Sequence, residues 1–360
     1  MPAQAIAGRR QPLIVEIEAS PAYEFLMTLF AFSEVEDHAT YDVGKRWFDD
    51  IRKKISPDLL AIVEQFGFHG HEIWKYMLGL AYDCLAPRDV PTFIALIEAT
   101  DPLELRLHML GYYVRHHHRT TSHEIILQAA QGDREAQKRL LNTSFPDDAL
   151  MQTTLHRVLS LEPAATKSLL LDIFHGWYDE VFREQEPLIL PILACDAETK
   201  LALKPTVSTE QLIESATGLE YVPEPGIQRV VLIPSYILRP WNVVTERYDT
   251  RIFCYPVADE SISADSHAPP ARLVKLAKAL ADERRLRILK KLATGSYTLQ
   301  EMAEDLGLAK TTLHHHIITL RSAGLVRMNL SDKRWSLRQG MVDNLGELLD
   351  TYLKGTPLRE

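Results

Sequence analysis

Apolar residues recur at helical spacing along most of the chain from Tyr23 to about Ser215. Before this stretch, the alternating run Leu13–Glu18 predicts a strand. Ser20 followed by Pro21 combines a helix N-cap with a proline at the first helical position. Further expected helix boundaries are marked by Pro57, Pro91, Pro102, Gly132, Pro146 and Pro163. This part of the chain is therefore predicted to be mainly helical, with about nine or ten helices.

The pattern changes between Tyr221 and Val257, where β-branched and aromatic residues are interrupted by prolines. Such runs predict three or four short strands in a small antiparallel sheet. The polar, proline-ended stretch 259–270 that follows is typical of a linker between domains.

After the linker, helical and extended patterns alternate over short distances. Three expected helices cover Ala271–Ala281, a stretch ending at Gly295, and a stretch capped by Thr298. Gly307 supplies a tight turn before a fourth helix, 310–323, which Gly324 ends. Tyr297 and the runs 325–329 and 334–337 are expected strands. This order predicts a winged helix-turn-helix.

The fold class is therefore mainly α with small β elements. We divide the chain into a helical and β regulatory or dimerisation domain (1–258), a linker (259–270), the winged helix-turn-helix (271–338) and a C-terminal helix and tail (339–360).

Composition sets the class of protein. An apolar content of 46% and a charged content of 25% are typical of a soluble globular protein. No apolar run approaches the roughly 20 residues that span a bilayer, and the N-terminus has no signal-peptide core. The three cysteines, each among apolar neighbours, match neither a disulfide framework nor a zinc motif, so we expect a cytoplasmic protein with unreactive, buried thiols.

Charge separates the C-terminal module from the rest. Residues 271–338 hold fourteen Lys and Arg against six Asp and Glu, a net charge of +8 in a chain whose total is −9. A cationic module on an anionic body is the pattern expected for duplex DNA binding.

The fourth helix would then be the recognition helix, with Leu313, Ile317 and Leu320 on its buried side. Ile318 is expected to point outward. The candidate DNA-binding side chains on this helix and the wing are Lys310, Thr311, Thr312, His314, His315, Arg321, Lys333 and Arg334.

The run LAKALADERRLRILKKLATGSYTLQEMAEDLGLAKTTLHHHIITLRSAGLV resembles the ArsR-type family of winged-helix repressors. The matching features are the LAxALADxxRLxIL opening, AxxLGLxxTTLxHH and the exit LRxAGLV. The resemblance implies a homodimeric transcription factor that binds double-stranded DNA, most often as a repressor. It also implies DNA-facing positions for Lys310, Thr311, Thr312, His314 and His315.

The chain departs from the family in three places. Ala309 stands where a serine usually caps the recognition helix. The helix before the turn has no cysteine, and the terminal helix from Met341 to Leu353 has neither histidine nor cysteine. Because both sensing sites of the family are missing, we expect no metal and no cofactor in this module.

The long N-terminal half resembles that of a subset of ArsR-type regulators of unknown ligand, most closely in VLIPSYILRPWNVV and RIFCYPV. We expect it to set dimer geometry, with a small-molecule effector left open. The alternative is an enzyme tethered to DNA, although no catalytic motif of recognisable spacing occurs and we expect no catalytic residues. A pocket with strongly perturbed titratable groups would favour the enzyme.

Three other features of the N-terminal half and tail each have two interpretations. The histidines at 108, 116–118 and 123 lack a complete ligand set, so a solvated helix end is favoured over a metal site. Trp47, Trp74, Trp177 and Trp241 are expected in the core rather than around an effector. The apolar stripe of the terminal helix pairs either with its twin in a dimer or with the chain's own first winged-helix helix; both remain open.

Overall fold

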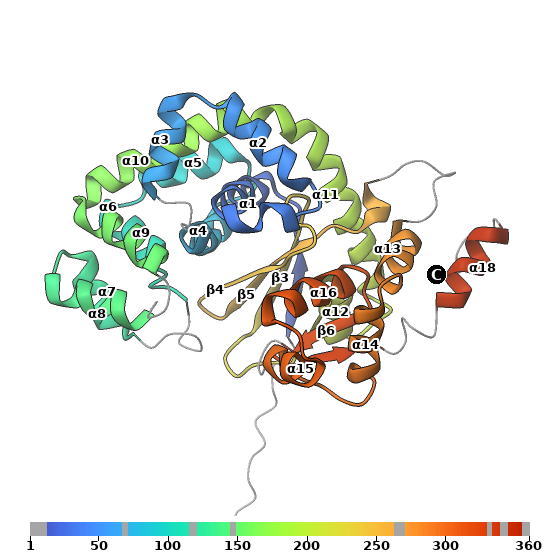
Figure 1. The fold of residues 1–360 in the computed structure, drawn as a ribbon. Helices are drawn as coiled ribbons and strands as arrows, with labels where there is room; N and C mark the ends of the chain where they lie inside the picture. The colour runs from blue at the N-terminus through green and yellow to red at the C-terminus, as the bar shows by residue number, and fades with distance from the viewer. Residues whose placement is uncertain are drawn as a thin grey trace, which may run out of the picture.

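The structure is a computed structural model that describes residues 13–66, 71–114, 121–144, 149–262, 271–329, 333–338 and 345–354. We call residues 13–262 the helical unit and residues 271–338 the winged-helix unit. The N-terminal helices curve in an arc around α1 and α4, and the strands β3, β4 and β5 lie between this arc and the winged-helix unit (Figure 1).

The helical unit is built from short helices. In chain order they are α1 (Pro21–Ser33), η1 (Val35–Thr40), α2 (Gly44–Lys54), α3 (Pro57–Phe66), α4 (His71–Asp83), α5 (Val90–Ala99), α6 (Pro102–Met109), α7 (His123–Ala130), α8 (Arg134–Ser144), α9 (Ala149–Ser160), α10 (Pro163–Trp177), η3 (Tyr178–Phe182), α11 (Arg183–Leu203), α12 (Thr209–Thr217) and η4 (Asp259–Ser261). The helices α1–α12 exceed the predicted nine or ten, because neighbours such as α5 and α6 are separated by only Thr100 and Asp101.

Proline and N-cap patterns located many of these helices correctly. Pro21, Pro57, Pro102 and Pro163 each begin a helix, as predicted. Pro146 lies outside the described residues. At α6, the Asp101 carboxylate accepts hydrogen bonds from the backbone N–H groups of the first turn, which satisfies donors that have no partner inside the helix.

The sheet of the helical unit is mixed, whereas the sequence predicted an antiparallel one. Its strands β1 (Ile14–Ile17), β3 (Arg229–Ser235), β4 (Val243–Arg247) and β5 (Thr250–Pro256) lie in the order β1-β3-β5-β4. Only β4 and β5 run antiparallel, joined by a tight turn at Tyr248 and Asp249. The strand β5 lies between β3 and β4 and pairs with β3 in parallel. The strand β1 pairs in parallel with the other edge of β3.

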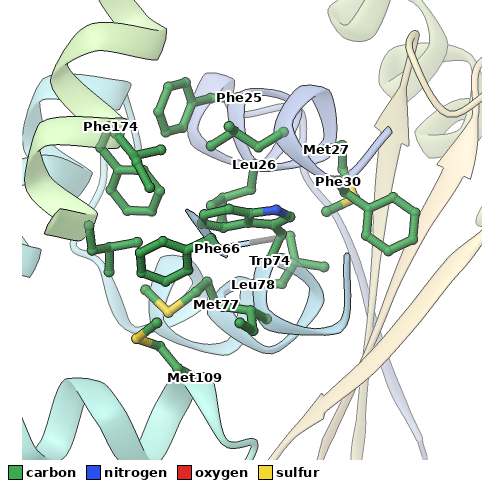
Figure 2. Packing of buried hydrophobic residues seen from close by; sticks show 14 of the residues in the cluster. Phe25, Leu26, Met27, Phe30, Phe66, Trp74, Met77, Leu78, Met109 and Phe174 are labelled. Carbon is green, nitrogen blue, oxygen red and sulfur yellow. The ribbon is translucent and has the colours of Figure 1, made fainter. Parts of the chain in front are cut away.

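Helix α1 is the centre of the helical core, since Ala22–Ser33 are all buried. Trp74 of α4 lies next to Leu26, Phe66 and Phe174 in this core (Figure 2), with its ring 5.8 Å from that of Phe66. Its indole N–H donates to Ser33 Oγ at 2.8 Å, so the buried polar atom has a partner. The prediction that the tryptophans are core residues is confirmed for Trp74 and Trp177, which are 1% and 0% exposed.

The winged-helix unit has the predicted element order and its own apolar core. Its elements are α13 (Ala271–Leu280), α14 (Glu283–Leu292), α15 (Leu299–Leu306), α16 (Lys310–Ser322), β6 (Val326–Asn329) and β7 (Trp335–Leu337), with a bridge between Tyr297 and Trp335. A capping box of Thr298 and Glu301 begins α15. Helix α18 (Leu345–Lys354) follows and contacts α13.

The two units share a sheet, which the sequence did not predict. The strand β2 (Leu219–Glu220) of the helical unit pairs in parallel with β6 of the wing, in the order β2-β6-β7. Ion pairs flank this junction: Arg327 contacts Glu214 at 2.8 Å and Glu220 at 3.7 Å, and Arg338 contacts Glu214 at 3.6 Å. The wing is therefore bound to the helical unit by both backbone and charge.

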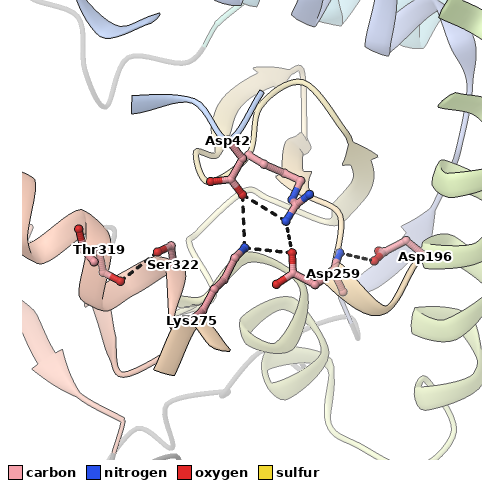
Figure 3. A network of polar contacts seen from close by, with 8 residues as sticks. Asp42, Asp196, Asp259, Lys275, Thr319 and Ser322 are labelled. Atoms are coloured by element: carbon pink, nitrogen blue, oxygen red, sulfur yellow. Dashed lines mark hydrogen bonds and ion pairs between the residues drawn. The ribbon is translucent and has the colours of Figure 1, made fainter. Parts of the chain in front are cut away.

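A second polar junction joins α13 to the helical unit (Figure 3). Lys275 Nζ lies 3.3 Å from Asp42 and 3.0 Å from Asp259, and both carboxylates also pair with Arg239. Two cations and two carboxylates thus form one network across the junction, where partly buried charges are screened less than exposed pairs.

Among the helices that the structure describes, none has the length and apolar character needed to cross a bilayer.

Candidate nucleic-acid interface

The recognition helix α16 begins directly after a glycine turn. Gly307 has φ +62°, a left-handed conformation that side-chain-bearing residues seldom adopt, and it ends α15 so that the chain can reverse into α16. Ala309 occupies the N-cap with extended backbone and makes no side-chain cap. The first N–H groups of α16 therefore lack a side-chain acceptor, and with the helix dipole they favour an anion.

One side of α16 holds it in the winged-helix core. Leu313, Ile317 and Leu320 are fully buried, as their spacing predicted. His316 shares this side, is 8% exposed, and was not recognised from the sequence. Desolvation lowers the pKa of His316, although the Asp282 carboxylate opposes the shift, because burial disfavours the charged ring.

The leading end of α16 brings several predicted DNA-binding side chains together on the surface. Lys310, Thr311 and His315 are exposed, and Thr312 is half-buried. Within the described residues, Lys310 has no ion-pair or hydrogen-bond partner for its ammonium group. A free cation, short hydroxyls and an imidazole are thus available at a helix N-terminus, which is the chemistry that contacts phosphates and base edges.

The next turn of α16 contacts the helical unit. The His314 ring stacks on the indole of Trp241, with centroids 6.0 Å apart and 27° between the planes. Ile318, expected to point outward from the buried side of α16, is not part of the winged-helix core but is only 9% exposed. The sequence did not predict this burial, because the contact of His314 with Trp241 places the helical unit beside this part of α16.

Arg321 and Lys333 lie apart from the exposed leading end. Both line a cavity of about 460 Å³ between the two units. Desolvation lowers the pKa of Arg321 to about 10, with no carboxylate nearby to oppose it. The Lys333 side chain is exposed as a whole, but partial desolvation lowers its pKa, as do the positive charges of Arg251 and Lys75, against Glu224.

Arg334, the remaining predicted DNA-binding residue, braces the wing. Its guanidinium donates to both oxygens of Glu301, at 3.0 and 2.8 Å, and to the Ser296 carbonyl at 2.8 Å. This forked pair ties β7 to the start of α15. The sequence predicted a DNA contact for Arg334 from its place at the wing tip. In the structure its guanidinium is hydrogen-bonded to Ser296 and Glu301 of the same unit.

The structure describes only part of the predicted histidine cluster. His116, His117 and His118 lie outside the described residues. His108 is 2% exposed and desolvation, followed by the charge of Arg247, lowers its pKa to about 3. No group of three or more metal-binding side chains occurs among the described residues.

The cysteines differ from one another in exposure. Cys84 and Cys254 are buried as expected, and burial raises the pKa of both thiols. Cys195 on α11 is exposed, so the expectation of burial was wrong there. The next residue, Asp196, takes the inward position instead, accepting hydrogen bonds from the Tyr255 hydroxyl at 2.8 Å and the Ala258 N–H at 2.7 Å.

Comparison with known proteins identifies the turn and both helices around it. Residues 282–328, which run from the start of α14 into β6, match the family described as "Bacterial regulatory protein, arsR family". No curated protein and no solved structure shows significant similarity to the chain.

Proposed function

Since the chain carries an ArsR-type helix-turn-helix domain, we propose that it is a homodimeric repressor that binds double-stranded DNA through α16. The observation that carries this proposal is the leading end of α16, where Lys310, Thr311 and His315 are exposed at an uncapped helix N-terminus. Two such helices would enter successive major grooves about one helical turn, roughly 10 bp, apart.

Each side chain has a distinct task in the proposed complex. Lys310 neutralises a phosphate, and Thr311 and Thr312 contact phosphate or base edges, while His315 reaches one turn deeper. His314 can also contact DNA once its ring no longer stacks on Trp241. Arg334 acts indirectly by holding the wing in shape, since its guanidinium is bound to Glu301.

The helical unit controls this activity in the proposed mechanism. Its Trp241 stacks on the His314 ring, and its carboxylates pair with the cations Lys275, Arg327 and Arg338. A duplex approaching α16 competes for the same face and some of the same charges. The chain would therefore exchange between this docked arrangement and an open one that binds DNA, and an effector acts by favouring one of them.

Helix α18 supports the dimer. Although it contacts α13, its side chains Leu349, Tyr352 and Leu353 are 47%, 40% and 71% exposed. Apolar side chains repeated on one helix are suited to pairing with a second copy across a twofold axis.

The test uses fluorescence anisotropy with duplexes recovered by sequencing the genomic DNA that the full chain binds. The variant combining Lys310→Ala, Thr311→Ala and Thr312→Ala is expected to lose specific binding while keeping its far-UV circular dichroism spectrum. Lys138→Ala removes an exposed cation from α8 and serves as the control, with unchanged affinity. Unaltered operator affinity in the triple variant would refute the assignment of α16 as the recognition helix.

The strongly shifted titratable groups of the helical unit do not favour the enzymatic alternative. Burial raises the pKa of Glu24 to about 7, but its carboxylate accepts hydrogen bonds from Ser235 Oγ and the backbone of Tyr236 and Ile237. Neither Glu24 nor His108 lines the 460 Å³ cavity. Their shifts reflect burial in the core, so no catalytic role is proposed for them.

A further inference from the structure

A cavity of about 460 Å³ lies between the two units. Helices α4 and α7–α9, the segment after α6 and the strands β4 and β5 supply most of its wall, and the winged-helix unit supplies Arg321, Met328 and Lys333. Its volume lies within the range of small-molecule sites, about 300–1,000 Å³. A molecule bound there would touch the recognition helix, the wing and the helical unit at once.

The charges around the cavity are unequal. Four cations and two carboxylates line it. Both carboxylates have cationic partners, because Glu72 pairs with Lys75 and Glu246 pairs with Arg251 at 2.5 Å. Arg321 and Lys333 have no carboxylate partner among the described residues. The two cations contributed by the winged-helix unit are thus the ones without an ion pair, although Glu224 acts on Lys333 from a longer distance.

Of these two cations, Arg321 is the stronger indication of an anion-binding site. Its position on the last turn of α16 removes much of its side chain from water, and desolvation is the cause of its lowered pKa. Burying a guanidinium without a partner is unfavourable, and such groups are usually paired or bound to an anion. An anion in the cavity would supply the missing interaction.

Two uncharged polar atoms in the wall are also unsatisfied. Thr245 is 3% exposed, and its Oγ1 has no hydrogen-bond partner among the described residues. The same holds for Asn242 Oδ1, although the amide nitrogen of Asn242 donates to the Thr217 carbonyl at 2.8 Å. Both residues line the cavity. An anionic oxygen can accept a hydrogen bond from the Thr245 hydroxyl, and a hydroxyl or N–H group on the ligand could donate to Asn242 Oδ1, whereas a pure hydrocarbon can satisfy neither atom.

The rest of the wall is apolar. Leu110, Ile126, Leu155, Val244 and Met328 line the cavity. A small inorganic anion would leave these surfaces without contacts, so the walls favour a ligand with an apolar body.

We propose that this cavity binds an amphipathic organic anion, a carboxylate or phosphate group carried on an apolar body. Arg321 and Lys333 hold the anionic group, with the Thr245 hydroxyl as a further donor, and the apolar body lies against Leu110, Ile126 and Leu155. The ligand bridges the two units and so stabilises the docked arrangement.

The regulatory consequence rests on the proposed function. Because the ligand contacts both units only when they are docked, and DNA requires α16 to be uncovered, the two compete. Thermodynamic linkage then demands that the ligand lower DNA affinity by the same factor by which DNA lowers ligand affinity. The ligand acts as an inducer that releases the operator.

The test measures ligand binding directly, by isothermal titration calorimetry on the full chain without DNA. The probes are decanoate, decyl phosphate, decanol, decylammonium and inorganic phosphate. Decanoate and decyl phosphate are expected to bind at least tenfold more tightly than decanol, and decylammonium more weakly still. If decyl phosphate binds and decanoate does not, the anionic group is a phosphate; the reverse result identifies a carboxylate. Inorganic phosphate is expected to bind weakly, since it makes no use of the apolar wall.

Variants locate the site. Lys333→Gln and Arg321→Gln are each expected to weaken anion binding about tenfold to a hundredfold, the size of a charge-assisted hydrogen bond, and to leave decanol binding unchanged. Lys333→Gln alters an exposed side chain and so keeps the test decisive even if Arg321→Gln is unstable. Equal affinity for decanoate and decanol, no anion binding, or anion binding unaffected by Lys333→Gln would overturn the proposal.

A further variant separates this proposal from the proposed function. Lys310→Ala at the leading end of α16 is expected to lose DNA affinity and to retain ligand affinity. A chain that binds the anions but no duplex overturns the proposed function alone. A chain that binds its operator but none of the anions overturns the ligand site alone.

Discussion

The His314 ring of the recognition helix stacks on Trp241 of the helical unit, with 6.0 Å between their centroids. Trp241 is itself fixed, because its indole N–H donates to Thr40 Oγ1 at 2.9 Å. A residue that we propose to face DNA is thus in contact with another part of the same chain. In the proposed mechanism, this stack is a point at which the helical unit restrains the winged-helix unit.

Removing the indole should release the recognition helix. Trp241→Ala is expected to raise operator affinity roughly threefold to tenfold, the amount that corresponds to an aromatic pair of about 0.5–1.5 kcal/mol. Fluorescence anisotropy with a labelled operator measures the change. Trp241→Phe keeps a ring against His314 and is the matched control, expected to stay near wild type. Lower operator affinity in Trp241→Ala, with the fold intact, would argue that the stack supports DNA binding.

Removing the Glu214 carboxylate from the junction should also favour DNA binding. Glu214 pairs with both Arg327 and Arg338, so Glu214→Gln removes one ion-pair partner from each of two cations and weakens docking, although Arg327 keeps Glu220. We expect operator affinity to rise by up to about fivefold, since half-exposed ion pairs contribute about 0–1 kcal/mol each. The fall of affinity with salt should steepen as well, because more cations reach phosphate.

Glu210 provides the control for this change, because it lies one turn earlier on α12 and has no ion pair among the described residues. Glu210→Gln removes the same charge from the same helix without breaking the junction. DNA titrations at several salt concentrations should give Glu210→Gln the same operator affinity and the same salt dependence as the wild type. Equal effects from the two variants would mean that net charge, rather than the junction, sets DNA affinity.

A missing helix cap can be restored. Ala309 already has the extended backbone of an N-cap, with φ −61° and ψ 140°. A serine there can accept a hydrogen bond from the first turn of α16, so Ala309→Ser is expected to raise the free energy of unfolding by about 1 kcal/mol. Urea denaturation of the winged-helix transition measures it. Ala309→Val, which cannot accept a hydrogen bond, should give no such gain.

The buried His108 predicts a loss of stability in mild acid. Its pKa of about 3 in the folded chain lies below the unfolded value of about 6.5, so folding excludes a proton that the unfolded chain binds. Its contribution to stability is therefore complete above pH 6.5 and declines as the pH falls toward 3. Between pH 6.5 and pH 5 the loss is about 2 kcal/mol.

Comparison with a His108→Leu variant isolates this contribution. Glu24 acts in the opposite direction: its pKa is raised to about 7 on folding, so its contribution increases as the pH falls from 7 to 4.5. The difference between wild type and His108→Leu cancels Glu24. Urea midpoints at pH 7 and pH 5 should show a smaller acid loss in the variant; equal losses would contradict a neutral His108.

The terminal helix should determine the oligomeric state. A chain truncated after Gln339 lacks the exposed Leu349, Tyr352 and Leu353, and we expect it to sediment as a monomer where the full chain sediments as a dimer. Sedimentation velocity measures the change. A truncated chain that remains a dimer would remove α18 from the interface.

Local patterns were sufficient for the winged helix. Gly307, the Thr298 capping position and the spacing of Leu313, Ile317 and Leu320 each specify a backbone conformation or a buried side through interactions within a few residues. The uncapped Ala309 was also evident from the sequence. The family match over 282–328 agrees with this part of the prediction.

The positions of Arg321, Lys333 and Ile318 were decided only by the tertiary structure. A cationic or apolar residue on the outer side of a helix has the same local pattern whether it meets DNA, solvent or another part of the chain. The pairing of β2 with β6 joins residues about a hundred positions apart in the sequence. The stacking of Trp241 on His314 also joins residues that are distant in the sequence. Such contacts depend on how whole units pack against each other. Hydrophobic periodicity reflects only residues that are near in the sequence, so it cannot predict these contacts.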